Sequence, residues 1–312
     1  MRVLLWHVHG AYTNSLVHGV HEYLLPALPE RGPDGLGRSE TFDWPPSAIE
    51  VTPEEVAEAH VDVVVLQRPQ ELHHLASQWL GGRVPGRDIP AVYLEHSLPQ
   101  GRIADMRHPA ANRTDLVLVH VTHFNALFWD SGTTPVRVIE HGIVDPGYRY
   151  TGELPHGAVV VNEPLRRGRV TGTDLIASLN GRVQLDVFGM GTEELAGYGD
   201  VAPPELWDEL GRRRAYIHPY RWTSLGFSLL EAMQLGMPVL ALATTEVVEA
   251  VPPEAGVVST RVEALADGLR RFVDDPGQAR EAGRAARKAA LDRYGLARFL
   301  RDWDALLEEV AR

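Results

Sequence analysis

The stretch between residues 214 and 241 has the residue types and spacing of an anion-binding turn. An apolar segment ends at Pro219, a loop containing Gly226 follows, and an apolar helical segment runs on to Gly236. A helix N-terminus behind a small, flexible loop offers backbone N–H groups and the positive end of the helix dipole, which suit a phosphate. Glu231 falls about one turn into that helix, where its carboxylate can accept hydrogen bonds from a vicinal diol such as a ribose. An ordinary strand–helix–strand unit with Glu231 on a solvated face is the alternative interpretation.

Arginines that follow another apolar segment could hold the same anion. Arg166, Arg167 and Arg169 come after an expected strand over 158–162. Lys288 is the only lysine of the chain, so an anionic group must be bound by arginine, histidine, polar side chains or backbone N–H groups. The planar guanidinium binds phosphate oxygens in pairs, which suits arginine to this task. A solvated basic turn is the alternative interpretation of these residues.

In the first half of the chain, a histidine and a glycine follow apolar segments. His96 follows an expected strand over 91–95, and Gly10 follows one over 3–8. A lone histidine at such a position is more often structural than a ligand contact, so these residues alone do not predict a site. No metal site is predicted, because the other close histidines come without the carboxylates that a zinc or iron site would use. Structural roles are therefore expected for His7, His9, His120 and His123.

The composition limits the classes of function. The chain has 312 residues, 44% of them hydrophobic, and a formal net charge of −12. The apolar share supports a folded core, and the acidic balance argues against a nucleic-acid binder. The absence of cysteine excludes disulfides, thiolate zinc sites and cysteine nucleophiles. The first apolar run is too short for a signal-peptide core, and no stretch reaches the length of a transmembrane helix. A cytoplasmic protein without a transmembrane segment is expected, with peripheral membrane contact left open.

Short apolar segments alternate with longer helical ones, which predicts two doubly wound α/β units with parallel sheets. A polar, turn-rich passage over 145–157 is expected to link them, and residues 31–53 to form an extended or weakly structured connection. The expected strands of the first unit lie at 3–8, 61–67, 91–95, 115–120 and 136–140. Those of the second lie at 158–162, 183–188, 215–218, 238–242 and 256–259. The expected helices of the second half lie at 173–179, 204–213, 226–235, 262–273 and 296–310.

Several of these segments resemble a known family, the retaining glycosyltransferases of the large family four (glycosyl transferases group 1). Its C-terminal signature reads Pro-Ser-x-x-Glu-Gly-Phe-Gly-Leu-Pro-x-Leu-Glu-Ala-Met-Ala-x-Gly-x-Pro-Val. The residues that match it are Gly226, Leu230, Glu231, Ala232, Met233, Gly236, Pro238 and Val239. The arginine-rich loop resembles the family's Gly-Arg and Lys-Gly segment, which holds the donor diphosphate. Gly189 and Gly191 resemble a Gly-x-Gly turn near the base, and His96 resembles the strand-end histidine that faces the donor sugar.

The resemblance implies the GT-B architecture and a retaining, metal-independent glycosyltransferase. A hexosyl or modified sugar would pass from a nucleotide-diphosphate sugar to an unidentified small-molecule or glycan acceptor, with no further cofactor. The Rossmann-like domains would be an acceptor-side domain over 1–151 and a nucleotide-sugar domain over 152–312, whose final helix is expected to pack back on the first. The resemblance implies catalytic roles for His96, Arg166, Arg167 and Glu231. It implies donor contacts for Gly10, Arg169, Thr171, Gly189, Thr223, Ser224, Leu225, Gly226, Phe227 and again Glu231.

The chain departs from the family's pattern at two positions. Thr223 stands where the family has the first glutamate of its signature, and Thr171 stands where it has the lysine. A site without that carboxylate suggests a deoxy or otherwise modified donor sugar. Two alternatives follow from the same departures: a non-catalytic nucleotide-sugar-binding homologue that acts as a partner subunit, and a nucleotide-sugar epimerase of GT-B fold.

Overall fold

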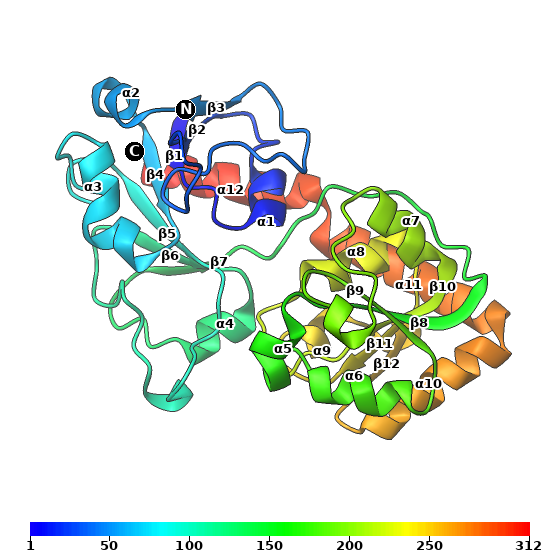
Figure 1. Ribbon diagram of the computed structural model, residues 1–312. Coiled ribbons are helices and arrows are strands. Elements are labelled where there is room, and N and C mark those ends of the chain that lie inside the picture. The colour runs from blue at the N-terminus through cyan, green and yellow to red at the C-terminus, as the bar shows by residue number, and fades with distance from the viewer. The chain divides into compact units, whose positions relative to one another are not determined.

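The computed structural model describes residues 1–312, and its contacts divide the chain into two α/β units (Figure 1). The first unit comprises Met1–Val144 and Leu296–Arg312, and the second comprises Asp145–Gly295. Residues 145–151, which the sequence assigns to the first domain, thus cluster with the second unit, and the final helix clusters with the first. Backbone hydrogen bonds explain the first difference, because the N–H groups of Arg149 and Tyr150 both donate to Leu235 O.

The first unit is built on a seven-stranded parallel sheet with the order β3-β2-β1-β4-β5-β6-β7. Its strands are β1 (Arg2–Leu5), β2 (Glu22–Pro26), β3 (Ala48–Val51), β4 (Val63–Leu66), β5 (Ala91–Glu95), β6 (Val117–His120) and β7 (Val136–Val138). The central strands read as near-continuous runs of Val and Leu because both faces of a parallel sheet are covered. Leu4, Val64 and Leu118 are completely buried in this core.

Short helices surround this sheet, and the last helix of the chain joins them. They are α1 (Gly10–Leu16), α2 (Pro53–Glu58), a π-helical turn (Glu71–Leu75), α3 (Ala76–Trp79), a 3₁₀ turn (Ile103–Asp105), α4 (His123–Phe128) and α12 (Leu296–Val310). A capping box starts α2, where Thr52 and Glu55 satisfy each other's backbone N–H groups. The apolar face of α12 is buried, and Trp303 Nε1 donates to Tyr12 Oη on α1 at 2.9 Å.

Two strands that the sequence does not predict, β2 and β3, form because they pair with neighbouring strands. β2 and β3 are short, and β3 lies inside residues 31–53, which were expected to be weakly structured. Tyr23 pairs with Val3 of β1, and Ala48 pairs in turn with Tyr23. A strand of four or five residues carries little periodicity of its own, so its neighbours determine whether it forms.

The second unit contains a five-stranded parallel sheet with the order β12-β11-β10-β8-β9. Its strands are β8 (Leu154–Val160), β9 (Leu185–Phe188), β10 (Arg213–His218), β11 (Val239–Leu242) and β12 (Gly256–Ser259). β8 begins inside the passage 145–157 that was expected to be a linker. It pairs with β10, and His156 Nδ1 lies 3.2 Å from Asp186 Oδ2 of β9. The residues at the start of β8 are of types that predict a turn, but their partners on neighbouring strands hold them in a strand.

The helices of the second unit follow the predicted alternation. They are α5 (Pro164–Arg167), a 3₁₀ turn (Gly168–Val170), α6 (Thr173–Asn180), a 3₁₀ turn (Glu193–Leu195), α7 (Glu205–Arg212), α8 (Phe227–Leu235), α9 (Val247–Ala250), a 3₁₀ turn (Pro253–Ala255), α10 (Val262–Asp274) and α11 (Pro276–Tyr294). None of the helices in either unit is long and apolar enough to cross a membrane.

Candidate functional site

The turn between β10 and α8 presents an uncapped helix N-terminus. Gly226 is the N-cap residue of α8, and this position makes no side-chain cap hydrogen bond. A Cβ atom at Gly226 would lie 2.8 Å from His218 Cε1, so glycine is needed for the close approach of the loop to the strand end. Ser224 and Leu225 are buried beside this turn, whereas Thr223 is partly exposed. The turn can therefore offer backbone N–H groups to an anion.

A buried histidine lies beneath this turn, at the carboxyl end of β10. His218 is completely buried, and its Nε2 atom has no hydrogen-bond partner. Burial lowers the pKa of His218 to about 3, so the ring is neutral at physiological pH. Its ring stacks on Tyr220 with 4.6 Å between the centroids. His218 lies within the stretch 214–241, directly before the first residue of the family signature, and the sequence assigns it no role. Its position at a strand end, next to Pro219, is the signal that could have identified it.

Glu231 sits on α8 in surroundings that disfavour its charge. Burial raises the pKa of Glu231 to about 7, an effect that the side chain of Trp207 on α7 partly opposes. The Trp207 indole N–H is buried and makes no hydrogen bond of normal length. A diol that donates two hydrogen bonds would stabilise the carboxylate form. The geometry is thus compatible with the predicted ribose contact.

The loop after β8 holds the arginines in unequal environments. Arg166 donates to Glu163, and Arg169 Nη1 donates to Asp174 Oδ2 at 2.9 Å. Arg167 forms no ion pair and lies over the ring of Tyr220, with its Cζ 5.7 Å from the ring centre. Arg167 is therefore the arginine of this loop whose charge is not already neutralised by a carboxylate.

Asp174 ties the arginine loop to the loop after β10. Arg221 donates to both carboxylate oxygens of Asp174, at 2.6 and 2.8 Å, and also to Arg169 O at 2.9 Å. The N–H of Arg221 donates to Val170 O at 2.9 Å. The sequence does not single out Asp174 or Arg221. These contacts make the two arginine-bearing loops one connected structure within the second unit.

Thr171 and Gly189 serve the backbone around these loops. Thr171 is completely buried, and its hydroxyl donates to Gly168 O at 3.1 Å. It therefore cannot reach outward as a lysine at this position could. Gly189 has a φ of +116°, and a Cβ atom there would collide with Val161 O. Glycine is thus required where the loops after β8 and β9 approach each other.

The first unit gathers neutral rings at the carboxyl ends of its strands. His96 follows β5, and its ring lies 4.1 Å from the ring of His9 and 4.7 Å from that of Tyr12, measured between centroids. Burial, together with the nearby His9 and His141, lowers the pKa of His96 well below its usual value. Gly10 is the first residue of α1, directly after His9. The residues predicted for the first unit thus lie close together.

A residue that the sequence does not identify completes this cluster. Gln67 directly follows β4, and its Oε1 lies 2.8 Å from His96 Nε2. No three of the chain's His, Asp and Glu side chains are arranged to share a metal ion. Gln67 belongs to no recognisable sequence motif. The only feature of the sequence that could have identified it is its position directly after a strand, as for His96.

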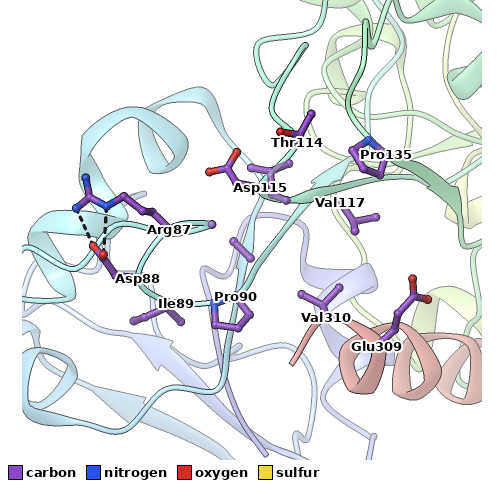
Figure 2. Close-up of a pocket in the computed structure, with 13 residues that line it drawn as sticks. Arg87, Asp88, Ile89, Pro90, Thr114, Asp115, Val117, Pro135, Glu309 and Val310 are labelled. Atoms are coloured by element: carbon purple, nitrogen blue, oxygen red, sulfur yellow. Dashed lines mark hydrogen bonds and ion pairs between the residues drawn. The ribbon is translucent and has the colours of Figure 1, made fainter. Parts of the chain in front are cut away.

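A cavity of about 390 Å³ in the first unit lies at the opposite edge of the sheet (Figure 2). Its lining includes Ala91 and Val117, the first residues of β5 and β6, and Val310 of α12. The charged side chains of its wall are already paired, Arg87 with Asp88 in particular. His96 lies at the carboxyl end of β5, so this cavity is separate from the predicted site residues.

Comparison with known proteins supports the fold and the class of the chain. Residues 193–289 match the family described as glycosyl transferases group 1. Sucrose-phosphate synthase from Thermosynechococcus elongatus superimposes with a TM-score of 0.73 at 14% identity, covering 99% of this chain and 98% of that one. Anabaena HepE in complex with UDP gives a TM-score of 0.71 at 14% identity over 99% of this chain and all (100%) of that one. No curated protein matches the chain in sequence.

A third structure has a similar extent of likeness. AviGT4, a glycosyltransferase involved in avilamycin A biosynthesis, superimposes with a TM-score of 0.65 at 16% identity, covering 100% of this chain and 98% of that one. The predicted GT-B fold, the family resemblance and the glycosyltransferase class are therefore confirmed. The roles of individual residues stay predictions.

Proposed function

Because residues 193–289 match the family described as glycosyl transferases group 1, we propose that the chain transfers a sugar from a nucleotide-diphosphate sugar to an acceptor hydroxyl with retention at the anomeric carbon. The observation that carries the proposal is the connected structure of the second unit. A helix N-terminus with glycine as its N-cap residue, an arginine without a carboxylate partner and a half-buried carboxyl group with a raised pKa all belong to loops or helices at one sheet. Such a set suits a diphosphate and a ribose.

The arginine loop and the start of α8 would act on the leaving group. As the bond between the anomeric carbon and the diphosphate oxygen breaks, negative charge builds up on the diphosphate. Arg167 and the first N–H groups of α8 would stabilise that charge more in the transition state than in the ground state. Arginine and backbone N–H groups would thereby take the place of a bound metal ion.

The reaction that we propose balances without a protein nucleophile. The acceptor oxygen bonds to the anomeric carbon on the face that the diphosphate leaves, and the acceptor proton passes to the leaving phosphate oxygen. His96 of the first unit would contact the transferred sugar. Its ring is neutral because burial lowers its pKa, so it would bind a hydroxyl group rather than a charge.

The threonine at position 223 leads us to expect that the enzyme accepts only certain donor sugars. Its hydroxyl is partly exposed beside the turn, and it cannot form the several hydrogen bonds of a glutamate. We expect a deoxy or otherwise modified sugar to be preferred over glucose or mannose. Thr223→Glu should then lose that preference; robust transfer of unmodified glucose or mannose by the wild type would contradict it.

The test of the proposed function is a panel of nucleotide-diphosphate sugars, beginning with uridine donors because HepE binds UDP. Thermal shifts identify the donors that bind, and a ligand at 100 times its Kd should add about 2.7 kcal/mol of stability. Nucleotide release and product analysis then follow, with and without acceptors. Slow donor hydrolysis or transfer supports the proposal. Binding without turnover across the panel would favour a non-catalytic homologue, and a changed sugar without an acceptor would favour an epimerase.

A further inference from the structure

The contact between Gln67 and His96 bears on which ring nitrogen of His96 carries the proton. Gln67 Oε1 and His96 Nε2 lie 2.8 Å apart. A neutral imidazole carries its hydrogen on either nitrogen, and an amide can be turned end for end, so this distance alone allows more than one arrangement. The second contact of the amide removes that freedom.

The backbone carbonyl of Trp6, the residue directly after β1, orients the amide of Gln67. Gln67 Nε2 donates to Trp6 O at 2.7 Å. A backbone carbonyl only accepts hydrogen bonds, so the amide nitrogen must face Trp6 and the amide oxygen must face His96. The amide oxygen is also only an acceptor. His96 Nε2 must therefore carry the hydrogen of this contact.

Gln67 is itself held in place by buried neighbours. Its backbone N–H donates to Glu71 Oε2 at 2.6 Å, and Arg68 donates to the other oxygen of the same carboxylate. Glu71 is completely buried, and Gln67 is almost so. A side chain packed in this way keeps one rotamer, so the amide presents a defined acceptor to His96.

We propose that Gln67 is a positioning residue that holds His96 in the tautomer with its proton on Nε2. The consequence for catalysis rests on the proposed function: Nδ1 of His96 keeps its lone pair and can accept, but not donate, a hydrogen bond from a hydroxyl of the donor sugar. The tautomer itself is a property of the free protein, and it can be measured without any substrate.

The first experiment measures the tautomer by nitrogen NMR of the full chain labelled with ¹⁵N-histidine. His96 is assigned by comparison with the variant His96→Gln. We expect Nε2 to have the pyrrole-type shift and Nδ1 the pyridine-type shift at neutral pH. In Gln67→Met, which keeps nearly the same volume but removes the acceptor, both shifts should move towards the average of the two tautomers. Gln78→Met, at an exposed position of α3, is the matched control and should change neither shift.

Two results would overturn the proposal: a wild-type His96 with its proton on Nδ1, or shifts that do not change in Gln67→Met. If that variant fails to fold, Gln67→Leu provides the second measurement, because it also removes the acceptor at a similar volume and should move both shifts in the same way. Unchanged shifts in Gln67→Leu would likewise overturn the proposal.

The catalytic consequence is measured separately on a donor that the wild type turns over. Gln67→Met should lower kcat about tenfold, the effect of one mispositioned hydrogen bond, and leave the Kd for the bare nucleoside diphosphate unchanged. Equal losses of kcat and nucleotide affinity would indicate a merely structural residue. If the wild type turns over no donor, the proposed function fails, but the NMR result still decides the tautomer.

Discussion

The strand ends of the two units carry different chemistry. In the second unit the loops after β8 and β10 carry arginines and precede an uncapped helix, which suits a group with formal negative charge. In the first unit the strand ends carry neutral rings and an amide, with His96, His9 and Gln67 in contact. In the proposed function, this difference corresponds to two kinds of recognition: charge neutralisation in the second unit, and hydrogen bonding to uncharged groups in the first.

Burial disfavours the charged form of titratable groups in both units, and it shifts the pKa of histidines and of a glutamate in opposite directions. It lowers the pKa of His218 and His120 to about 3 and raises the pKa of Glu231 to about 7. A neutral histidine in such a place stays neutral over the physiological range. Glu231, in contrast, can change its charge near neutral pH when a ligand arrives. Mutation and pH can therefore separate the two kinds of recognition.

The largest effect is expected at Arg167. Arg167→Ala should lower kcat about 10²- to 10³-fold, because it removes a charge that would stabilise the departing diphosphate. Arg166→Ala is the matched control: its guanidinium is exposed and already paired with Glu163, so its loss should cost far less. Steady-state kinetics of both variants with the same donor provide the measurement. An equal or larger loss in Arg166→Ala would place the diphosphate contact elsewhere in the loop.

His96 should affect the sugar and not the nucleotide. His96→Ala is expected to lower kcat by roughly 10- to 100-fold, with a much smaller change in the Kd for the bare nucleoside diphosphate, because the contact proposed for the histidine is with the uncharged part of the donor. Kinetics and calorimetry together measure the split. His74→Ala, at an exposed position, controls for general effects. Parallel losses in both quantities would assign His96 a structural role.

Glu231 should make nucleotide affinity depend on pH. Its pKa of about 7 in the free protein means that a ligand which needs the carboxylate must displace a proton below that pH. The affinity for a nucleoside diphosphate that the panel identifies should therefore be constant above neutrality and fall by up to about tenfold per pH unit below it. The 2′-deoxy analogue should bind more weakly. Calorimetry from pH 6 to 8 tests this. Glu231→Gln is the control for titration of the phosphate, and a pH profile identical to the wild type would contradict the ribose contact.

The smallest effect is expected on stability, through His120 of the first unit. Its folded pKa of about 3 lies below the unfolded value of 6.5, so the unfolded chain binds the proton more readily as the pH falls. The contribution of the neutral ring is complete above pH 6.5 and is lost as the pH drops towards 3, by about 2 kcal/mol at pH 5. Thermal melts should show a smaller acid-induced decrease of Tm in His120→Leu than in the wild type. A decrease of the same size in both proteins would rule out His120 as a source of acid sensitivity.

Long, patterned segments of this chain were predictable from local sequence. The alternation of apolar strands and helices predicts the doubly wound units, because both faces of a parallel sheet must be covered. The signature around Glu231, with Gly226 before it and Gly236 after it, predicts the strand, the turn and the helix of β10 and α8. Positions that need glycine, such as Gly189 with its positive φ, can be recognised because few other residues adopt that backbone.

The tertiary structure alone determined which strands pair and what surrounds each side chain. β2 and β3 form because β1 offers them a neighbour, and β8 starts early because β10 does. Arg166, Arg167 and Arg169 look alike in sequence, but only their neighbours show which of them lacks a carboxylate. Gln67 carries no motif, and its relation to His96 and Trp6 spans residues far apart in the chain. Local sequence determines what a segment can form, whereas the direction of a hydrogen bond or the charge of a buried group depends on atoms that only the folded chain brings together.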